Sequence, residues 1–306
     1  MKLISPRRMT LLELVRNSFP EISASKAKKI ILYGCCSYCG GVVKSPELVL
    51  PGNAVVEYEK YVGGVQMRRE TTPLPVLFED EFLLVAVKPA GMKLETRSQN
   101  GQPSFFSLMR AYVRKQSHGH VSLCMVNRME TGDAGLCVLA KNKRMQELLR
   151  NSWGKDTLLH FRALIHGTLP KRNDTLTFWI EKNGKGKPRR LPAGDPNALR
   201  TQTEYRVLNR NEMYSEVELI PYQDYPPQLH FCMERMETPI VGDYTYGDEL
   251  NPRRFQKLFG YKLQLKHPAT ARRFVLEMSL PETFQDVSLY KFQTVSEEKK
   301  DNNSLQ

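Results

Sequence analysis

The pattern of predicted helices and strands changes near residue 74, and this change constrains the fold more than any other feature. The first part predicts two short helices and a hairpin, whereas short β-rich runs with one or two helices between them fill the second part up to about residue 283. The predicted fold class is α+β. The predicted units are a small helical and hairpin domain over residues 1–60, a linker over 61–73, a mixed-sheet domain over 74–285 and a polar, disordered tail over 286–306.

The chain also carries a large excess of positive charge. Its 306 residues include 45 Lys and Arg against 33 Asp and Glu, a formal net charge of +12. Such an excess favours a polyanionic partner, because Lys and Arg release counterions when they neutralise phosphates, although charge alone is equally compatible with an acidic protein. The sequence has no run of roughly 18 apolar residues, which predicts no membrane span. Sparse cysteines and the lack of a secretory pattern predict a cytoplasmic protein.

The predicted N-terminal domain begins with two amphipathic helices. Apolar residues at helical spacing start near Met9, and Pro20 ends the first helix. Ser23 or Ser25 can cap the second helix, which runs toward Gly34. A strand, a glycine turn and a second strand are predicted over residues 38–43, and an alternating strand over 54–58.

This order of elements resembles the S-four-type RNA-binding domain over about residues 9–60. The resemblance implies that the second helix faces an RNA backbone. Its phosphate contacts would then be Lys26, Lys28 and Lys29. Without the resemblance, the three lysines would be equally compatible with a solvated helix face.

Two basic loops stand out in the larger domain, over residues 182–190 and 251–262. Each loop alone is compatible with an ordinary solvated loop. Together with the N-terminal lysines they favour a distributed phosphate-binding surface. The RNA contacts predicted in the first loop are Lys185, Lys187, Arg189 and Arg190.

Six segments of the larger domain occur in the order of one enzyme family. They are VLFEDEFLLVAVKPAG (76–91), VNRMETGDAGL (126–136), FRALIHG (161–167), TEYRVL (203–208), PIVGD with a following YG (239–247) and KHP (266–268). These segments resemble the RluA-type pseudouridine synthases, including their "H-R-L-D-x-x-T-S-G-L" catalytic loop, across about residues 74–281. The resemblance implies a mixed sheet with flanking helices, and isomerisation of a flipped-out uridine in structured RNA with no cofactor or metal.

In that family the reaction depends on one aspartate, a tyrosine that packs on the base, and an arginine that holds the aspartate. The matching positions here are Glu130, Phe161 and Gln228. Glutamate keeps the charge but moves it by one methylene, and a displacement of about 1 Å can cost on the order of 10²-fold in rate. Phenylalanine has no hydroxyl for proton transfer, and glutamine supplies no positive charge. All three catalytic residues of the family are therefore replaced in this chain.

Two residues near Glu130 are candidates to take over its role. Asp133 could approach the same cleft, but a turn residue that satisfies the local backbone is the favoured interpretation. Arg128 is retained, and the resemblance implies a role in flipping the base or ordering the loop, so it is counted among the RNA contacts. Pro226 and Pro227 lie where the family motif continues, and they are expected to distort a strand there.

The cysteines and histidines do not predict a metal or nucleophile site. Cys36 and Cys39 have metal-ligand spacing and follow Cys35, but no second pair lies close in sequence, so their role stays open and no zinc site is predicted. The other three cysteines lie in apolar runs and are predicted to be core residues. The six histidines are scattered and form no triad spacing.

Two hypotheses remain, with a third less favoured. The favoured one is a monomeric RNA-binding protein that resembles a pseudouridine synthase, has lost some or all catalysis, and binds structured RNA such as rRNA or tRNA. The alternative is an active pseudouridine synthase, an isomerase that uses Glu130 or Asp133. A basic domain with only a protein partner is the third, and the N-terminal resemblance argues against it.

Overall fold

The computed structural model describes most of the chain. The residues it does not describe are 33, 40, 60–73, 97–102, 118–120, 183–186, 249–255, 282–283, 285–292 and 295–306. The predicted linker over 61–73 and the predicted RNA contact Lys185 therefore lie outside the described residues, as do Arg253 and Arg254 of the second basic loop. The same holds for the predicted tail, except for strand β17 (Gln293–Thr294), which pairs with a strand of the main sheet.

The N-terminal part contains the helices and the hairpin that the sequence predicts. A capping box between Thr10 and Glu13 starts helix α1, and the Ser23 hydroxyl accepts a hydrogen bond from the backbone of Lys26 (3.2 Å) at the start of α2. The hairpin pairs β3 with β4 in antiparallel register. The elements are β1 (Lys2–Ile4), β2 (Met9–Thr10), α1 (Leu11–Ser18), α2 (Ala24–Leu32), β3 (Cys36–Tyr38), β4 (Gly41–Val43), β5 (Leu48–Leu50) and β6 (Val55–Tyr58).

The larger part is built on a mixed sheet, as predicted. Following the pairings, its main strands run in the order β12, β13, β14, β11, β15, β10, β8, β7, and only the short β10–β15 pairing is parallel. Strands β9 and β16 add to β10 and β15. The strands are β7 (Val76–Glu79), β8 (Leu83–Lys88), β9 (Cys124–Met125), β10 (Ala134–Ala140), β11 (Thr157–His166), β12 (Asn173–Glu181), β13 (Ala198–Arg210), β14 (Tyr214–Pro221), β15 (Leu258–Lys266) and β16 (Arg273–Met278).

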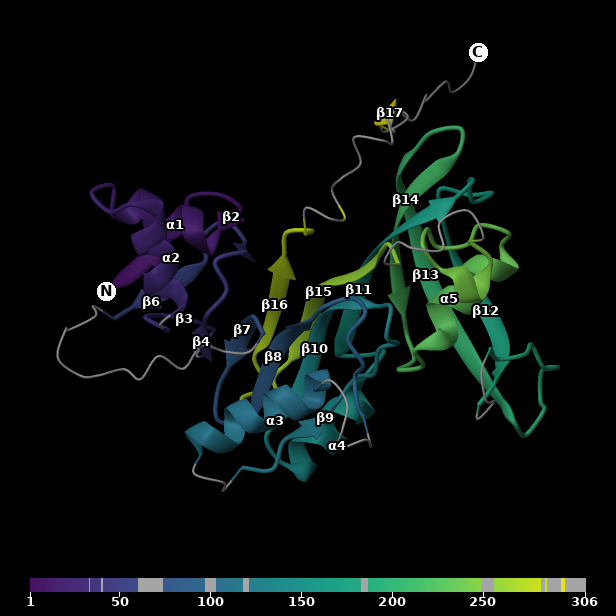
Figure 1. Cartoon of the computed structure of the whole chain (residues 1–306), viewed down its shortest axis with the longest axis horizontal. Helices are drawn as coiled ribbons and strands as arrows, with labels where there is room; N and C mark the ends of the chain where they lie inside the picture. The colour runs from purple at the N-terminus through teal and green to yellow at the C-terminus, as the bar shows by residue number, and fades with distance from the viewer. Residues whose placement is uncertain are drawn as a thin grey trace, which may run out of the picture.

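Among the described residues, three α-helices flank this sheet. The sequence predicts one or two helices in this part, over residues 103–115 and 143–153, and the structure has α3 (Phe105–Gln116) and α4 (Lys143–Ser152) there. The third, α5 (Pro227–Arg235), packs against β12, β13 and β14 and leads to the short 3-10 helix η1 (Tyr244–Tyr246). Figure 1 shows α5 beside the green strands, far from α3 and α4. No helix in the described parts of the chain is long and apolar enough to cross a membrane.

Helix α5 corrects one prediction from the sequence. Pro226 and Pro227 were expected to distort a strand, but Pro226 is the N-cap of α5 and Pro227 is its first residue. Proline is compatible with this position, because the first N–H groups of a helix have no intrahelical partner and the ring fixes φ near the helical value. The two prolines therefore start a helix in place of disrupting a strand.

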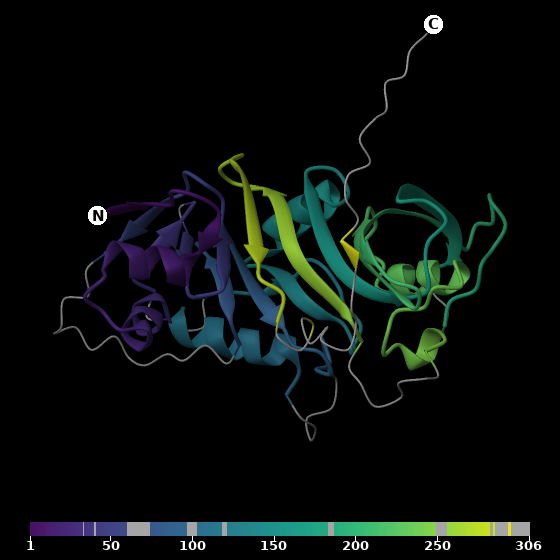
Figure 2. The same cartoon turned by 90° about the horizontal axis from the view of Figure 1, so that it is seen from above.

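The two parts of the chain share strand pairings. Strand β5 pairs with β16, and β4 pairs with β7. Gly41 at the start of β4 lies against the ring of the buried Phe78, and a Cβ added to this glycine would lie 2.4 Å from that ring. Figures 1 and 2 show the N-terminal unit, in purple, beside β7 and β16. The core is continuous across this junction.

Candidate functional site

The candidate catalytic loop lies between β9 and β10, and a buried amide fixes its start. Asn127 is 1% exposed, and its side chain accepts a hydrogen bond from Val138 N (2.7 Å) and donates one to Leu136 O (3.4 Å). The Lys88 ammonium at the end of β8 donates to the carbonyl oxygens of Asp133 (2.6 Å) and Thr131 (3.1 Å). Burial lowers the pKa of Lys88 to about 8. The loop is therefore held at both ends by strands of the sheet.

Glu130 occupies this loop in a partly buried position. Its backbone N–H donates to Asp133 Oδ2 (2.9 Å), which is the local turn contact predicted for Asp133. Burial raises the pKa of Glu130, and the positive charge of His230 only partly offsets the effect of burial and of two neighbouring carboxylates. Glu130 is therefore a weaker acid than an exposed glutamate.

Asp133 also takes part in a buried ionic cluster that the sequence did not reveal. Its Oδ1 lies 2.9 Å from His230 Nε2, and the other ring nitrogen of His230 lies 2.6 Å from Asp243 Oδ2. His230 is 0% exposed, Asp243 is 0% exposed and Asp133 is 3% exposed. We call these three residues the Asp133–His230–Asp243 cluster.

The cluster holds its histidine in the charged form. Burial acts to lower the pKa of His230, but the charges and hydrogen bonds of Asp133 and Asp243 raise it well above its ordinary value. Burial likewise acts to raise the pKa of Asp133, yet the charge of His230 outweighs it, and the pKa of Asp133 lies below its ordinary value. A positive charge thus lies near Glu130, but two other carboxylates already contact it.

The other two family positions flank the loop from separate elements. Phe161 lies in β11, is 7% exposed and lines the floor of the cleft. Gln228 is fully buried at the start of α5, and its amide nitrogen donates to Gln202 O (2.7 Å) and Thr203 Oγ1 (2.8 Å) of β13. Its carbonyl oxygen has no hydrogen-bond partner among the described residues. Gln228 therefore anchors α5 to β13 through its amide.

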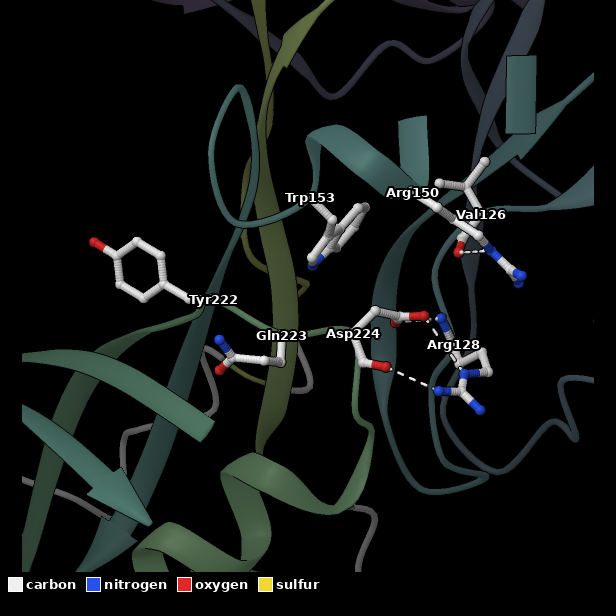
Figure 3. Close-up of a pocket in the computed structure, with 7 residues that line it drawn as sticks. All are labelled: Val126, Arg128, Arg150, Trp153, Tyr222, Gln223 and Asp224. Atoms are coloured by element: carbon white, nitrogen blue, oxygen red, sulfur yellow. Dashed lines mark hydrogen bonds and ion pairs between the residues drawn. The ribbon is translucent and has the colours of Figure 1, made fainter. Parts of the chain in front are cut away.

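Arg128 is bound to Asp224, the residue two before Pro226. Asp224 Oδ1 accepts from the backbone of Arg128 (2.8 Å), and the guanidinium contacts Asp224 Oδ2 (3.4 Å) and the Asp224 carbonyl (2.9 Å). Figure 3 shows this pairing across the cleft. Arg128 therefore pairs with Asp224 at the start of the catalytic loop.

Two cavities lie on either side of this ion pair. The inner one measures only about 30 Å³, and its walls include Asp133, Phe161 and Tyr225. That volume holds about two water molecules and no nucleobase. The outer one measures about 470 Å³ (Figure 3). Arg128, Trp153, Gln223 and Asp224 line both cavities, so the outer cavity is the mouth of a cleft whose floor is closed.

The other predicted RNA contacts differ in whether their charged groups already contact other residues. Lys26, Lys28 and Lys29 of α2 are all exposed. In the first basic loop, Lys187 forms an ion pair with Glu234, and Arg189 forms one with Glu181 (3.1 Å). The Arg190 guanidinium lies 5.9 Å from the centre of the Phe178 ring. The lysines of α2 are thus more available to a partner than this loop.

The sequence alone does not reveal the Asp133–His230–Asp243 cluster or the aromatic side chain of Trp153 in the cleft mouth. Asp133 and His230 are 97 residues apart, so no local spacing could reveal their contact. Trp153 ends the helix that the sequence predicts over residues 143–153, and nothing in the sequence indicates that it lines both cavities. Of the cysteines, Cys35 and Cys36 are buried and Cys39 is exposed, and no group of three His, Cys, Asp or Glu in the described residues is placed to hold a metal.

The known proteins that are similar to this chain are RNA pseudouridine synthases, although no protein-family model matches the sequence. An uncharacterized RNA pseudouridine synthase of Aquifex aeolicus is 25% identical over an alignment of 303 residues, which covers 90% of this chain and 91% of that protein. The ribosomal large subunit pseudouridine synthase D of Pseudomonas aeruginosa is 24% identical, and the alignment covers 89% of this chain and 88% of that protein.

Solved structures agree on the fold. Human RNA pseudouridylate synthase domain containing 4 superposes with a TM-score of 0.58 at 18% identity, and the match covers 72% of this chain and 94% of that one. The human domain containing 1 gives the same TM-score at 16% identity. The chain is thus similar to RNA pseudouridine synthases along nearly its whole length and shares their fold, in agreement with the resemblance of its six ordered motifs to the RluA-type members.

Proposed function

We propose that this chain is an RNA-binding member of the family whose synthase activity is impaired or absent. The observation that carries the proposal is the state of Gln228. It stands where the family motif has an arginine, it has no charge, and both hydrogen bonds of its amide nitrogen go to β13. Glu130 therefore lacks the charged partner that would keep a catalytic carboxylate ionised and oriented.

Two further features of the cleft support impaired catalysis. Burial raises the pKa of Glu130, which reduces the ionised fraction that the chemistry needs. The floor beside Phe161 leaves about 30 Å³, too little for a flipped-out base. Asp224 is one wall of this floor, and its three contacts with Arg128 hold that wall in place.

RNA is the proposed partner because both the relatives and the charge favour it. The relatives are named as RNA pseudouridine synthases, including one that acts on the large ribosomal subunit. The chain has a net charge of +12, and α2 presents Lys26, Lys28 and Lys29 on its exposed face. We therefore propose that structured RNA, such as rRNA or tRNA, binds across α2 and the cleft mouth to one copy of this protein in the cytoplasm.

An active synthase is the second candidate, and one observation favours it. Glu130 keeps a carboxylate in the catalytic loop, and the charged His230 lies close enough to act on its pKa. In this alternative the Arg128–Asp224 pair opens when RNA binds, and Glu130 performs the role of the family aspartate.

One sample can test both parts of the proposal. The purified protein is mixed with structured, uridine-containing RNA, the bound fraction is measured by filter binding, and the bound RNA is analysed for pseudouridine by nucleoside mass spectrometry. We expect binding that weakens steeply as salt increases, with no pseudouridine above the protein-free control. Absence of binding would refute the RNA partner, whereas pseudouridine that forms with wild type and not with Glu130→Ala would establish the active alternative.

A further inference from the structure

The mouth of the cleft has the composition of a nucleotide site. Its cavity of about 470 Å³ is lined by two aromatic residues, Trp153 and Tyr222, and by polar side chains that include Arg150 and Gln223. Pockets of this size, with aromatic walls and a few oriented polar groups, are typical of small-ligand sites. In the view of Figure 3 the Trp153 indole lies between the side chains of Gln223 and Arg150.

The polar groups of the mouth are held in place by bonds that leave donors available. Gln223 uses its carbonyl oxygen to accept from Gln202 N (2.6 Å), and its NH₂ group has no hydrogen-bond partner among the described residues and is not buried. The Arg150 guanidinium donates to Met125 O (3.1 Å) and Val126 O (3.2 Å), and this side chain is otherwise exposed. Both groups are therefore pre-oriented donors with spare N–H groups.

The indole nitrogen of Trp153 is a third donor in the mouth that lacks an acceptor. Nε1 is buried, and within the described part of the chain it has no hydrogen-bond partner. Buried indole N–H groups usually have a partner, and an orphan one calls for an explanation such as an absent ligand. A carbonyl oxygen of a ligand in the mouth would supply that acceptor after a small side-chain shift.

The charge of the mouth favours an anionic ligand. Arg128 and Asp224 compensate each other in their ion pair, whereas Arg150 bonds only to neutral carbonyl groups. The mouth thus offers one uncompensated cation, spare N–H donors and two aromatic rings. A nucleotide matches all three features, since it carries a phosphate, base carbonyls and a flat ring.

We infer that the cleft mouth is a binding subsite for one unpaired nucleotide of RNA, whose base packs against Trp153 and Tyr222 and accepts a hydrogen bond from Gln223, and whose phosphate lies against Arg150. This inference rests on the proposed function and deepens it, because it assigns the RNA a contact outside the closed catalytic floor. The nucleotide would be held in front of the Arg128–Asp224 pair and would not reach Glu130.

Tryptophan fluorescence tests this site directly. The chain has two tryptophans, and Trp179→Phe leaves Trp153 as the sole reporter. Titration of this variant with uridine monophosphate is expected to quench Trp153 emission with a saturable curve. Gln223→Ala in the same background should raise the dissociation constant about fivefold, because it removes one hydrogen bond worth roughly 1 kcal/mol.

Gln116→Ala in the same background is the matched control, since Gln116 is exposed at the end of α3 and does not line the mouth. This variant should bind as the Trp179→Phe protein does. Equal saturable quenching by inorganic phosphate alone would overturn the nucleotide assignment, and so would unchanged affinity in Gln223→Ala.

Structured RNA separates this inference from the proposed function. If the RNA binds to the protein but neither it nor uridine monophosphate alters Trp153 emission, the subsite is refuted and the proposed function stands. If uridine monophosphate quenches Trp153 saturably but structured RNA does not bind, the subsite stands and the RNA-binding function is refuted.

Discussion

His230 is fully buried behind the cleft, and the carboxylates of Asp133 and Asp243 raise its pKa well above the ordinary value. Asp133 and Asp243 contact both of its ring nitrogens, and Gln256 donates a hydrogen bond to the other oxygen of Asp243 (3.0 Å). A buried charge is tolerated only when it is paired and hydrogen-bonded. The cluster therefore ties together the catalytic loop, α5 and the segment before η1.

Removal of the histidine charge should strongly destabilise the fold. In His230→Gln the carboxylates of Asp133 and Asp243 lose their shared cation, and breaking a buried ion pair typically costs about 3–5 kcal/mol. Urea unfolding followed by circular dichroism measures the loss. Lys171→Ala, which breaks an exposed ion pair with Asp174, is the control and should leave the unfolding midpoint nearly unchanged. An equally small effect of both variants would show that the cluster does not stabilise the fold.

The contribution of the cluster should depend on pH in both directions. The folded pKa of His230 is raised, so its contribution is complete below the ordinary histidine pKa and is lost as the pH rises through the folded value. The folded pKa of Asp133 is lowered, so its contribution is lost as the pH falls below the ordinary aspartate value.

The difference in unfolding free energy between wild type and His230→Gln should accordingly be largest between roughly pH 4 and pH 6.5. It should shrink on both the acidic and the alkaline side of this window. Urea unfolding of both proteins across a pH series measures the difference, and a constant difference would mean that His230 is not held in its charged form.

At the scale of single elements, α2 is the best candidate for contact with phosphates. Its buried side carries Ala27 and Ile31, while Lys26, Lys28 and Lys29 are exposed. Each lysine that neutralises a phosphate contributes roughly 0.7 to 0.9 units to the slope of log K against log salt. The triple change to alanine should therefore weaken RNA binding and reduce that slope by about 2 to 3 units.

Fluorescence anisotropy with a labelled structured RNA at several salt concentrations measures this slope. The control removes three exposed lysines elsewhere, in Lys155→Ala, Lys171→Ala and Lys266→Ala combined. If both triple variants lower the slope equally, the binding reflects net charge and α2 is not a specific contact.

The elements that the sequence predicted correctly share a clear local signal. Helices α1 to α4 show apolar residues at helical spacing with caps or turn residues at their ends, as in the Thr10 capping box and the Ser23 cap. Helix α5 has a weaker signal because six consecutive residues of its nine, Gln228 to Met233, are buried, so apolar and polar residues do not separate onto two faces. Family motifs located Glu130, Phe161 and Gln228, but only the folded chain could reveal that His230 joins two carboxylates from different segments.

At the scale of the whole molecule, the N-terminal unit is joined to the main sheet and is not merely tethered to it. Strands β4 and β5 continue the pairing onto β7 and β16, and Arg8 forms an ion pair with Glu277 of β16. This junction places α2 on the same rigid framework as the cleft. The basic charge of the two parts can thus act on one RNA molecule.

Gly41→Ala tests how tightly the two parts are joined. The new Cβ would lie 2.4 Å from the Phe78 ring, so the ring or the strand must shift, and such overpacking typically costs about 1–3 kcal/mol. Gly52→Ala is the matched control, because its new Cβ would meet nothing closer than 3.6 Å. Thermal unfolding should show a clear loss for the first variant alone, and equal losses would contradict a tight junction at β4.

The central claim is that this chain holds RNA without efficiently modifying it. The most direct test incubates structured, uridine-containing RNA with a molar excess of protein, so that even a single slow turnover per molecule is detected, and then quantifies pseudouridine by nucleoside mass spectrometry. We predict that wild type and Glu130→Ala bind the RNA equally and that both leave its pseudouridine content at the level of the protein-free control. Pseudouridine formed by wild type and abolished by Glu130→Ala would contradict the claim.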